Sequence, residues 1–253
     1  RERDVNGRER EVSNRRVFSD FTLSPPKSVS IVALLGGDWR IVAAHERATR
    51  IALEELEKFA ATRVHNGGDI SDRATANIVA SVFRHDTSRA LDPHLHSHCI
   101  LFNATFDAVE ARWKALQNYE MLRARKYVEN VYYHELARDL RAFGYEIQNH
   151  SRGDFEIKGV SREICHTFSK RHREIDERTR KLLTREPELA TGTRGDVRVH
   201  IAPNNRSRQM KDVAPARLRG LWSSQISEDE NAALSSLLAR VGADTSSVSQ
   251  INA

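Results

Sequence analysis

Cysteine and long apolar segments are scarce in this sequence. Among its 253 residues only Cys99 and Cys165 are cysteines, too few for the disulfide framework of a small secreted domain. No apolar run approaches the roughly 20 residues that a membrane-spanning helix needs, and no secretory signal is visible at the start. We therefore expect a protein of the reducing cytoplasm that makes no membrane contact.

A glycine-rich nucleotide loop is also missing. The nearest candidate, LLGGD at residues 34–38, lacks the spacing of a phosphate-binding loop, which argues against ATP binding. The chain has no initial methionine and opens with the charge-dense stretch RERDVNGRERE. Such a start is typical of the middle of a longer protein, so we expect further sequence before it.

The sequence does contain enough apolar residues for a core and an excess of basic ones. Hydrophobic residues make up 39%, which suits one domain with appendages. Lys and Arg number 40 against 35 Asp and Glu, and basic residues cluster between Arg194 and Arg219. Guanidinium groups pair well with phosphates, which favours nucleic acid as the partner. We expect a core at residues 1–185 and, at residues 186–253, a basic and partly helical DNA-gripping extension of the same domain. The alternative for the extension is an ordinary solvated surface.

Three histidines alternate with other residues in the strand-like segment DPHLHSHCILF. Successive side chains of a strand point to opposite faces, so His94, His96 and His98 share one face. Three imidazoles gain little from packing together, whereas a divalent metal binds neutral imidazoles held on one pleat. A single buried histidine is usually an ordinary core group, but three on one face favour a metal site.

Two further residues extend this candidate site. His85 comes before the Asp-Pro turn that opens the histidine strand, so a hairpin would bring it beside His96 and His98 and leave coordination positions open. His94 directly follows the turn, and we leave it out of the ligand set. Asp20 lies within a predicted strand, where a carboxylate is costly unless it meets a histidine, a metal or a nucleophile. The alternative is an exposed carboxylate on an edge strand.

Periodicity along the chain predicts an α+β fold with a central antiparallel sheet covered by helices. Strands are expected at residues 16–23, 75–83 and 111–116 and at the histidine segment, with a hairpin at 145–150 and 154–159. Helices are expected at residues 25–36, 38–59, 119–144, 161–183 and 228–241. The sheet would carry the histidines, and the basic extension would follow as an appendage.

Three blocks of the sequence resemble one protein family. FTLSPPKSVSIVALLGGD, FRHDTSRALDPHLHSH and FSKRHREI look like the corresponding blocks of MobF-type conjugative relaxases, in the same order and with matching spacing. The resemblance runs from about Phe18 to Ser169, with a looser fit to the end. Because these relaxases are HUH-type endonucleases, it implies an antiparallel sheet with metal-binding histidines on a central strand.

The resemblance also implies site residues and partners. His85, His96 and His98 would bind one divalent metal, Mg²⁺ or Mn²⁺ in function with Zn²⁺ as the alternative. Asp20 would accept the proton of the nucleophile or hold His96 or His98 in the required tautomer. The implied substrate is single-stranded DNA at an origin of transfer, next to a hairpin, and the implied partners of the monomer are accessory relaxosome proteins. The side chains that we predict to contact DNA are Lys27, Arg84, Arg194, Arg206, Arg208 and Lys211.

One departure from the family concerns the nucleophile. Relaxases of this type attack with a tyrosine near the natural N-terminus, forming a 5′-phosphotyrosyl intermediate, but the first tyrosine here is Tyr119. Tyr132 and Tyr133 fall within a predicted helix, where the resemblance implies packing. We therefore expect this chain alone to lack the nucleophilic tyrosine.

Two other functions remain compatible with the sequence. A binding module that recognises an origin hairpin without cutting it would share the basic surface and lack only the tyrosine. A zinc-dependent hydrolase would use the same three histidines with a metal-bound hydroxide. The arginine-rich segment argues against the hydrolase, because a small uncharged substrate does not need it.

Charge reversal at Arg206 and Arg208 tests the predicted DNA grip. The chain carrying Arg206→Glu and Arg208→Glu should bind a single-stranded oligonucleotide more weakly than the unchanged chain. Because fewer counterions are released, its log affinity should depend less steeply on log salt, by about 0.7 for each lost phosphate contact. Fluorescence anisotropy over a salt series measures both quantities, and an unaltered slope would place the grip elsewhere.

Overall fold

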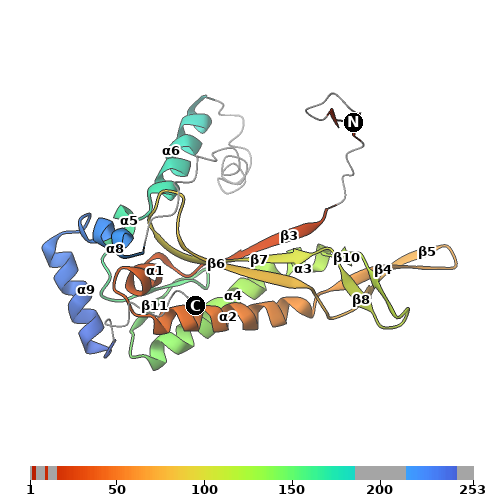
Figure 1. Ribbon diagram of the computed structural model, residues 1–253, viewed down its shortest axis with the longest axis horizontal. Coiled ribbons are helices and arrows are strands. Elements are labelled where there is room, and N and C mark those ends of the chain that lie inside the picture. Colours follow the sequence, from red (N-terminus) through yellow and green to blue (C-terminus); the bar gives the residue numbers. More distant parts are fainter. Residues whose placement is uncertain (1, 4–8, 11–15, 186–214, 244–253) are drawn as a thin grey trace.

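A three-stranded antiparallel sheet forms the middle of the molecule (Figure 1). Its strands are β3 (Phe18–Leu23), β7 (Pro93–Phe102) and β6 (Ala80–Thr87), and β7 lies between the other two. The histidine segment is therefore the central strand of this sheet. The computed structural model describes residues 2–3, 9–10, 16–185 and 215–243.

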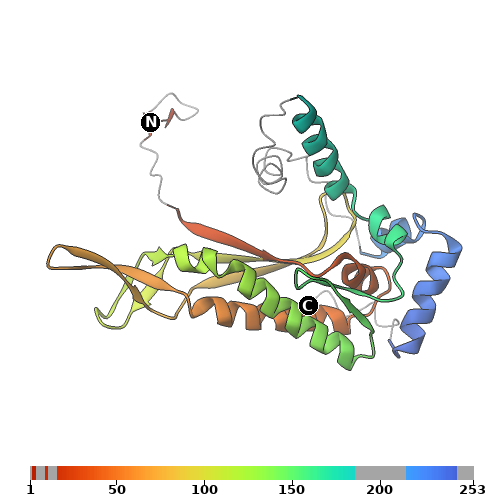
Figure 2. The same ribbon diagram turned by 180° about the vertical axis from the view of Figure 1, so that it is seen from behind.

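Two long helices cover one face of the sheet. α2 (Arg40–Glu57) and α4 (Arg125–Ala142) run side by side beneath it, as the front and back views agree (Figure 1 and Figure 2). The shorter α1 (Lys27–Leu34) packs against β7 nearer its start. Within the described residues no helix is long and apolar enough to cross a membrane.

Exposure alternates along β7. The side chains that face the helices are at most 1% exposed, and they are Leu95, Ser97, Cys99 and Leu101. The intervening residues, from His94 to Phe102, are partly exposed on the opposite face. This alternation is typical of an antiparallel sheet with one packed face. The expected antiparallel sheet covered by helices is confirmed.

Shorter elements surround this central unit. The helices are α3 (Tyr119–Arg123), α5 (Arg162–Thr167), α6 (Lys170–Arg185), α8 (Pro215–Ser223) and α9 (Glu228–Arg240). In the described part of the chain the other strands form four small antiparallel sheets. These are β1 (Glu2–Arg3) with β2 (Glu9–Arg10), β4 (Ala61–Asn66) with β5 (Asp69–Ala74) and with β10 (Leu116–Gln117), β8 (Thr105–Asp107) with β9 (Arg112–Lys114), and β11 (Ile147–Asn149) with β12 (Phe155–Ile157).

Some elements differ from the sequence-based expectation. The helix expected at residues 119–144 divides at Ala124 into α3 and α4, and the helix expected at 161–183 divides into α5 and α6. The β4–β5 hairpin was not expected, although its turn contains Asn66-Gly67, a strong hairpin signal. Gly67 adopts a positive φ of 58°, which glycine tolerates without steric cost.

The last two helices pack against the same core. Leu234, Leu237 and Leu238 of α9 are buried among core residues. From α8, the indole nitrogen of Trp222 donates a 2.6 Å hydrogen bond to the carbonyl oxygen of Leu91. Residues 215–243 therefore belong to one packed unit with the central sheet.

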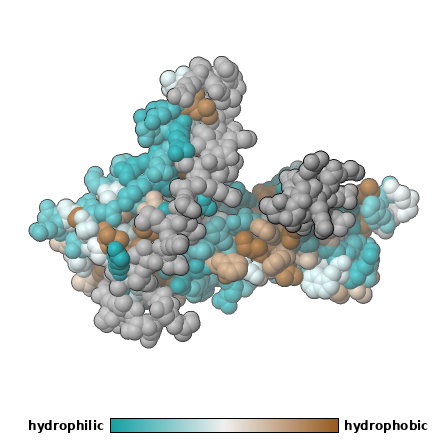
Figure 3. Space-filling view, turned by 45° about the horizontal axis from the view of Figure 1, so that its top comes forward, coloured by the Kyte–Doolittle hydropathy of each residue, from teal (hydrophilic) through white to brown (hydrophobic). Residues whose placement is uncertain are grey.

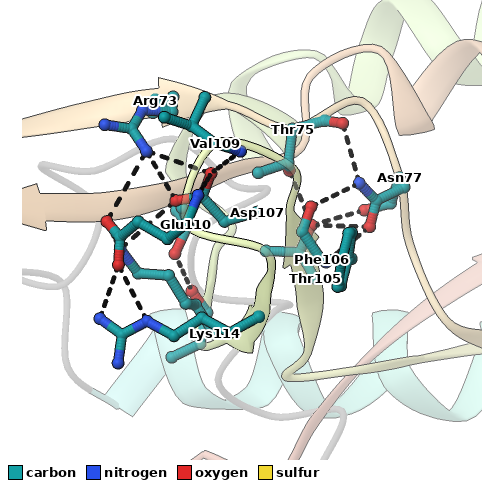
Figure 4. Close-up of polar contacts among 12 residues, drawn as sticks. Arg73, Thr75, Asn77, Thr105, Phe106, Asp107, Val109, Glu110 and Lys114 are labelled. Carbon is teal, nitrogen blue, oxygen red and sulfur yellow. Dashed lines mark hydrogen bonds and ion pairs between the residues drawn. The ribbon is translucent and has the colours of Figure 1, made fainter.

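A network of charged side chains fixes the β8–β9 hairpin to β5 (Figure 4). The buried carboxylate of Asp107 accepts hydrogen bonds from Arg73 at 2.8 and 3.1 Å and from the backbone nitrogen of Val109 at 3.0 Å. Lys114 lies 2.7 Å from Glu110 in the same network. Because Asp107 is paired with several donors, its burial is compensated and the hairpin is held in one position.

A second buried carboxylate joins the start of α2 to the end of α4. Asp38 is 1% exposed and accepts hydrogen bonds from the Tyr145 hydroxyl at 2.7 Å and from the Arg40 guanidinium at 2.7 and 2.9 Å. It also accepts a 3.2 Å hydrogen bond from the backbone nitrogen of Arg40, the first residue of α2. The hydrogen bond between Asp38 and Tyr145 connects residues 107 positions apart.

Replacing Asp38 should therefore destabilise the fold. Asp38→Ala leaves the buried Tyr145 hydroxyl without its acceptor, and we expect the free energy of unfolding to fall by about 2 kcal/mol. Glu120→Ala is the control, because its ion pair with Arg123 is exposed and should contribute little. Urea denaturation followed by circular dichroism measures both. Equal effects of the two substitutions would contradict the role assigned to Asp38.

Candidate metal and nucleic-acid site

Three of the predicted site residues lie together on the exposed face of the sheet. His85 on β6 pairs directly with His96 on β7, and His98 follows on the same face. The ring centres are 5.3 Å apart for His85 and His96, 5.5 Å for His85 and His98, and 5.2 Å for His96 and His98. The three rings thus form a nearly equilateral triangle.

Hydrogen bonds orient two of these rings. Nδ1 of His96 lies 2.9 Å from the carbonyl oxygen of His94, to which it donates. Nδ1 of His98 lies 2.8 Å from a carboxylate oxygen of Asp20, on the neighbouring strand β3. Each bond places the ring proton on Nδ1, which leaves the Nε2 lone pair available to a ligand. The hydroxyl of Thr22 lies within 3.3 Å of the same His98 nitrogen and adds a second partner.

His94, which is outside the triangle, packs against one of its members. The His94 ring stacks on His96 with 4.5 Å between their centres. Burial, together with the nearby positive charge of Lys27, lowers the pKa of His94 to about 3. Burial is also the main cause that lowers the pKa of His96. Both rings are therefore neutral at pH 7, the protonation state that a metal ligand requires.

The triangle fits a divalent cation in its chemistry and approximate spacing. Three imidazoles bound to one ion through nitrogen at about 2.1 Å have ring centres roughly 5 Å apart, close to the separations here. As the side chains are placed in the described part of the chain, no group of three or more His, Cys, Asp or Glu could hold a metal ion. Rotation of the rings is thus required to bring their free nitrogens onto one point.

Two of the six side chains predicted to contact DNA lie in the described part of the chain. The Lys27 amine is half-buried beside the start of β7 and donates to the carbonyl oxygen of Pro93 at 3.0 Å. Burial lowers its pKa. Arg84 forms ion pairs with Glu46 at 2.5 Å and Asp86 at 3.4 Å, so contact with phosphate would compete with two carboxylates. The other four predicted contacts lie outside the described residues, and they are Arg194, Arg206, Arg208 and Lys211.

Apolar side chains lie beside the histidines on the same face. Phe83 pairs across from His98, and Phe18 pairs across from Phe102. These phenylalanines are 55%, 52% and 39% exposed, in the order Phe83, Phe18 and Phe102. The surface view also has a hydrophobic area over the middle of the molecule (Figure 3). Trp113 is 60% exposed, whereas Trp222 is buried and cannot stack on a base.

Four tyrosine hydroxyls are hydrogen-bonded to residues outside the histidine triangle. Tyr132 contacts His45, Tyr127 donates to Glu55, and Tyr133 donates to Glu129. The Tyr145 hydroxyl is bonded to Asp38, as described above. Burial raises the pKa of Tyr132, so its phenol stays protonated. Tyr119 is exposed at the start of α3, with the Arg123 guanidinium over its ring.

Sequence reasoning missed a polar cluster behind the histidine strand. His45, Ser97 and Tyr132 are buried and hydrogen-bonded to one another on the helix-covered face of β7. The signal was present, because His45 falls at a core-facing position of an amphipathic helix whose other core-facing residues are mostly apolar. Ser97 is likewise a polar residue on the buried face of the strand.

Comparison with known proteins gives one consistent result. The family model of the TrwC relaxase matches residues 2–228. The multifunctional conjugation protein TraI of Escherichia coli strain K12 is 37% identical over 177 residues, which are 65% of this chain and 10% of TraI. The chain thus spans about a tenth of the length of that curated relative.

Solved structures agree in fold. A copper-bound structure of the conjugative relaxase TrwC in complex with oriT DNA has a TM-score of 0.73 and 32% identity, covering 94% of this chain and 75% of that one. A metal-bound structure of TrwC with oriT DNA has a TM-score of 0.74 and 31% identity, covering 97% and 78%. Since the family match extends over most of the sequence and the folds coincide, the chain belongs to the TrwC relaxase family.

Proposed function

We propose that this chain belongs to a relaxase domain that, together with a nucleophilic tyrosine not found in these 253 residues, nicks and rejoins single-stranded DNA at an origin of transfer during plasmid conjugation. The observation that carries the proposal is the triangle of His85, His96 and His98, with Asp20 bonded to one of its corners. The related TrwC structures contain oriT DNA, and two of them are metal-bound or copper-bound. A transesterification of this kind conserves the energy of the phosphodiester bond and needs no ATP.

The proposed cofactor is one divalent cation held by the three histidines, Mg²⁺ or Mn²⁺ in function with Zn²⁺ as the alternative. When bound, such an ion supplies positive charge beside the non-bridging oxygens of the scissile phosphate. Three neutral imidazoles leave that positive charge uncompensated, which suits an anionic substrate. The chain's own contribution is to hold the three rings close together and to orient His96 and His98 through their Nδ1 hydrogen bonds.

Asp20 has two proposed tasks. Its carboxylate accepts a hydrogen bond from Nδ1–H of His98 and so keeps Nε2 free for the cation. Its side chain is 39% exposed, so a carboxylate oxygen is also accessible to take a proton from an attacking hydroxyl. Thr22, which also contacts His98, would steady the ring while the carboxylate acts as a base.

The proposed partner is single-stranded DNA next to a hairpin, with accessory relaxosome proteins, in the cytoplasm and with the domain acting as a monomer. The strand would cross the open face of the sheet, where the triad and the three exposed phenylalanines lie. Lys27 is near the histidine row and retains donor capacity beyond its one backbone bond, which suits a neighbouring phosphate. Basic residues of the extension would hold the DNA farther from the site.

The metal triad is tested by removing single histidines. His96→Ala and His98→Ala should each abolish stoichiometric uptake of Mn²⁺ or Zn²⁺, because two imidazoles alone make a weak site. His94→Ala should have a smaller effect. His65→Ala is the matched control, since His65 is an exposed strand histidine on β4. Isothermal calorimetry measures the stoichiometry, and unchanged binding in both of the first two variants would exclude the triad.

The absence of a matching tyrosine gives a second test. The chain of 253 residues should bind an origin oligonucleotide with Mg²⁺ or Mn²⁺ yet form no covalent adduct, because the tyrosines are either engaged in the helical layer or, for Tyr119, placed at a helix start. Attaching an upstream segment that contains the family's tyrosine should create an adduct that a chelator prevents.

A denaturing gel with a labelled oligonucleotide measures the adduct in both proteins. A covalent band from the chain alone would contradict the prediction, and mapping the labelled peptide would identify the tyrosine responsible. Failure of the extended protein to form an adduct would instead favour the non-cleaving hairpin-binding module.

A further inference from the structure

Behind the histidine face, three buried polar side chains form one hydrogen-bonded chain. Nε2 of His45 lies 2.7 Å from the hydroxyl oxygen of Ser97, and Nδ1 lies 2.7 Å from the hydroxyl oxygen of Tyr132. None of the three residues is more than 1% exposed. They come from α2, β7 and α4, so the hydrogen bonds join both covering helices to the central strand.

The protonation of this chain follows from its burial. Burial lowers the pKa of His45 to about 3, so the ring is neutral at pH 7 and has a single N–H. It can therefore serve two hydroxyls only by donating at one nitrogen and accepting at the other. The Tyr132 and Ser97 hydroxyls each have one proton and no other acceptor among the described residues, so one of them donates to the ring and the other accepts from it. In either arrangement both hydrogen bonds are formed.

Ser97 occupies a particular place on that strand. It lies between His96 and His98, and its side chain leaves the opposite face of the same pleat. Fixing the Ser97 hydroxyl against α2 therefore fixes the rotation of the strand about its own axis at the point where the two imidazoles emerge. A small rotation there would move both ring nitrogens together relative to His85 on β6.

We propose that His45, Ser97 and Tyr132 are positioning residues that hold His96 and His98 at the spacing required for one divalent cation. This inference rests on the proposed function, because it assumes that the triad binds a metal. Packing alone does not call for such a network, since apolar residues of the same shape would fill the space without desolvating three polar groups. No member of the network reaches the face on which substrate would lie.

Binding of Cu²⁺ tests the inference without reference to DNA cleavage. The variants are Ser97→Ala, Tyr132→Phe and His45→Gln, in which the glutamine amide can still donate to Ser97. Thr49→Val is the matched control, because Thr49 lies one turn along α2 and is 2% exposed, with a hydroxyl that has no hydrogen-bond partner. Cu²⁺ titration gives the affinity, and electron paramagnetic resonance reports the geometry of the coordinated nitrogens.

The expected effects are graded. Ser97→Ala should weaken Cu²⁺ binding about tenfold and change the copper hyperfine coupling, as loss of a supporting hydrogen bond does in other metal sites. Tyr132→Phe removes a hydroxyl that is bonded to His45 and not directly to Ser97, so it should do the same to a smaller extent. His45→Gln should retain most of the unchanged chain's affinity, and Thr49→Val should match the unchanged chain in both measurements. Circular dichroism melting confirms that each variant is folded at the temperature of comparison.

Two outcomes separate failure of the inference from failure of the proposed function. If the unchanged chain takes up no stoichiometric Cu²⁺, the metal triad itself is wrong. If the unchanged chain binds one Cu²⁺ and Ser97→Ala has the same affinity and spectrum, the triad stands and the positioning role is wrong. A control that perturbs both measurements as strongly as Ser97→Ala would also overturn the positioning role.

Discussion

The two-residue period of β7 is the constraint on which the fold and the site both depend. One set of its side chains packs against the helices, and the other set presents the histidines. A shift of one residue would bury the imidazoles and expose Leu95 and Leu101, so the same hydrophobic burial that stabilises the sheet also selects the face on which the histidines lie. Neither role can be altered independently, because both belong to one strand held between two neighbours.

The local parts of this arrangement were predictable from the sequence. Alternation placed His94, His96 and His98 on one face, and the turn before them placed His85 on the adjacent strand. Sequence reasoning could not choose which histidine Asp20 would contact, because that depends on the register between β3 and β7, set by pairing over 78 residues of separation. The structure assigns the contact to His98.

Long-range packing was the part that the sequence did not reveal. Tyr132 was expected to have a packing role, and its burial agrees, but its hydrogen bond to His45 joins residues 87 positions apart. Trp222 is likewise buried and hydrogen-bonded to Leu91, 131 positions away. Local propensity contains no information about such partners, because they are selected by how the helices settle on the sheet. The β4–β5 hairpin is different, because its Asn-Gly turn is a hairpin signal that the local sequence does contain.

The turn that opens β7 is held by two helices from distant parts of the chain. Asp92 accepts a 2.9 Å hydrogen bond from the backbone nitrogen of Lys170 on α6, and Leu91 accepts from Trp222 on α8. The end of α6 that contacts this turn and the α8 residue that contacts it are therefore close in space, although 52 positions separate Lys170 from Trp222 in the sequence. Four of the basic residues predicted to bind DNA fall between these two positions in the sequence. DNA bound both by them and by the histidine face would be held at two places, and the first contact would then raise the effective concentration for the second.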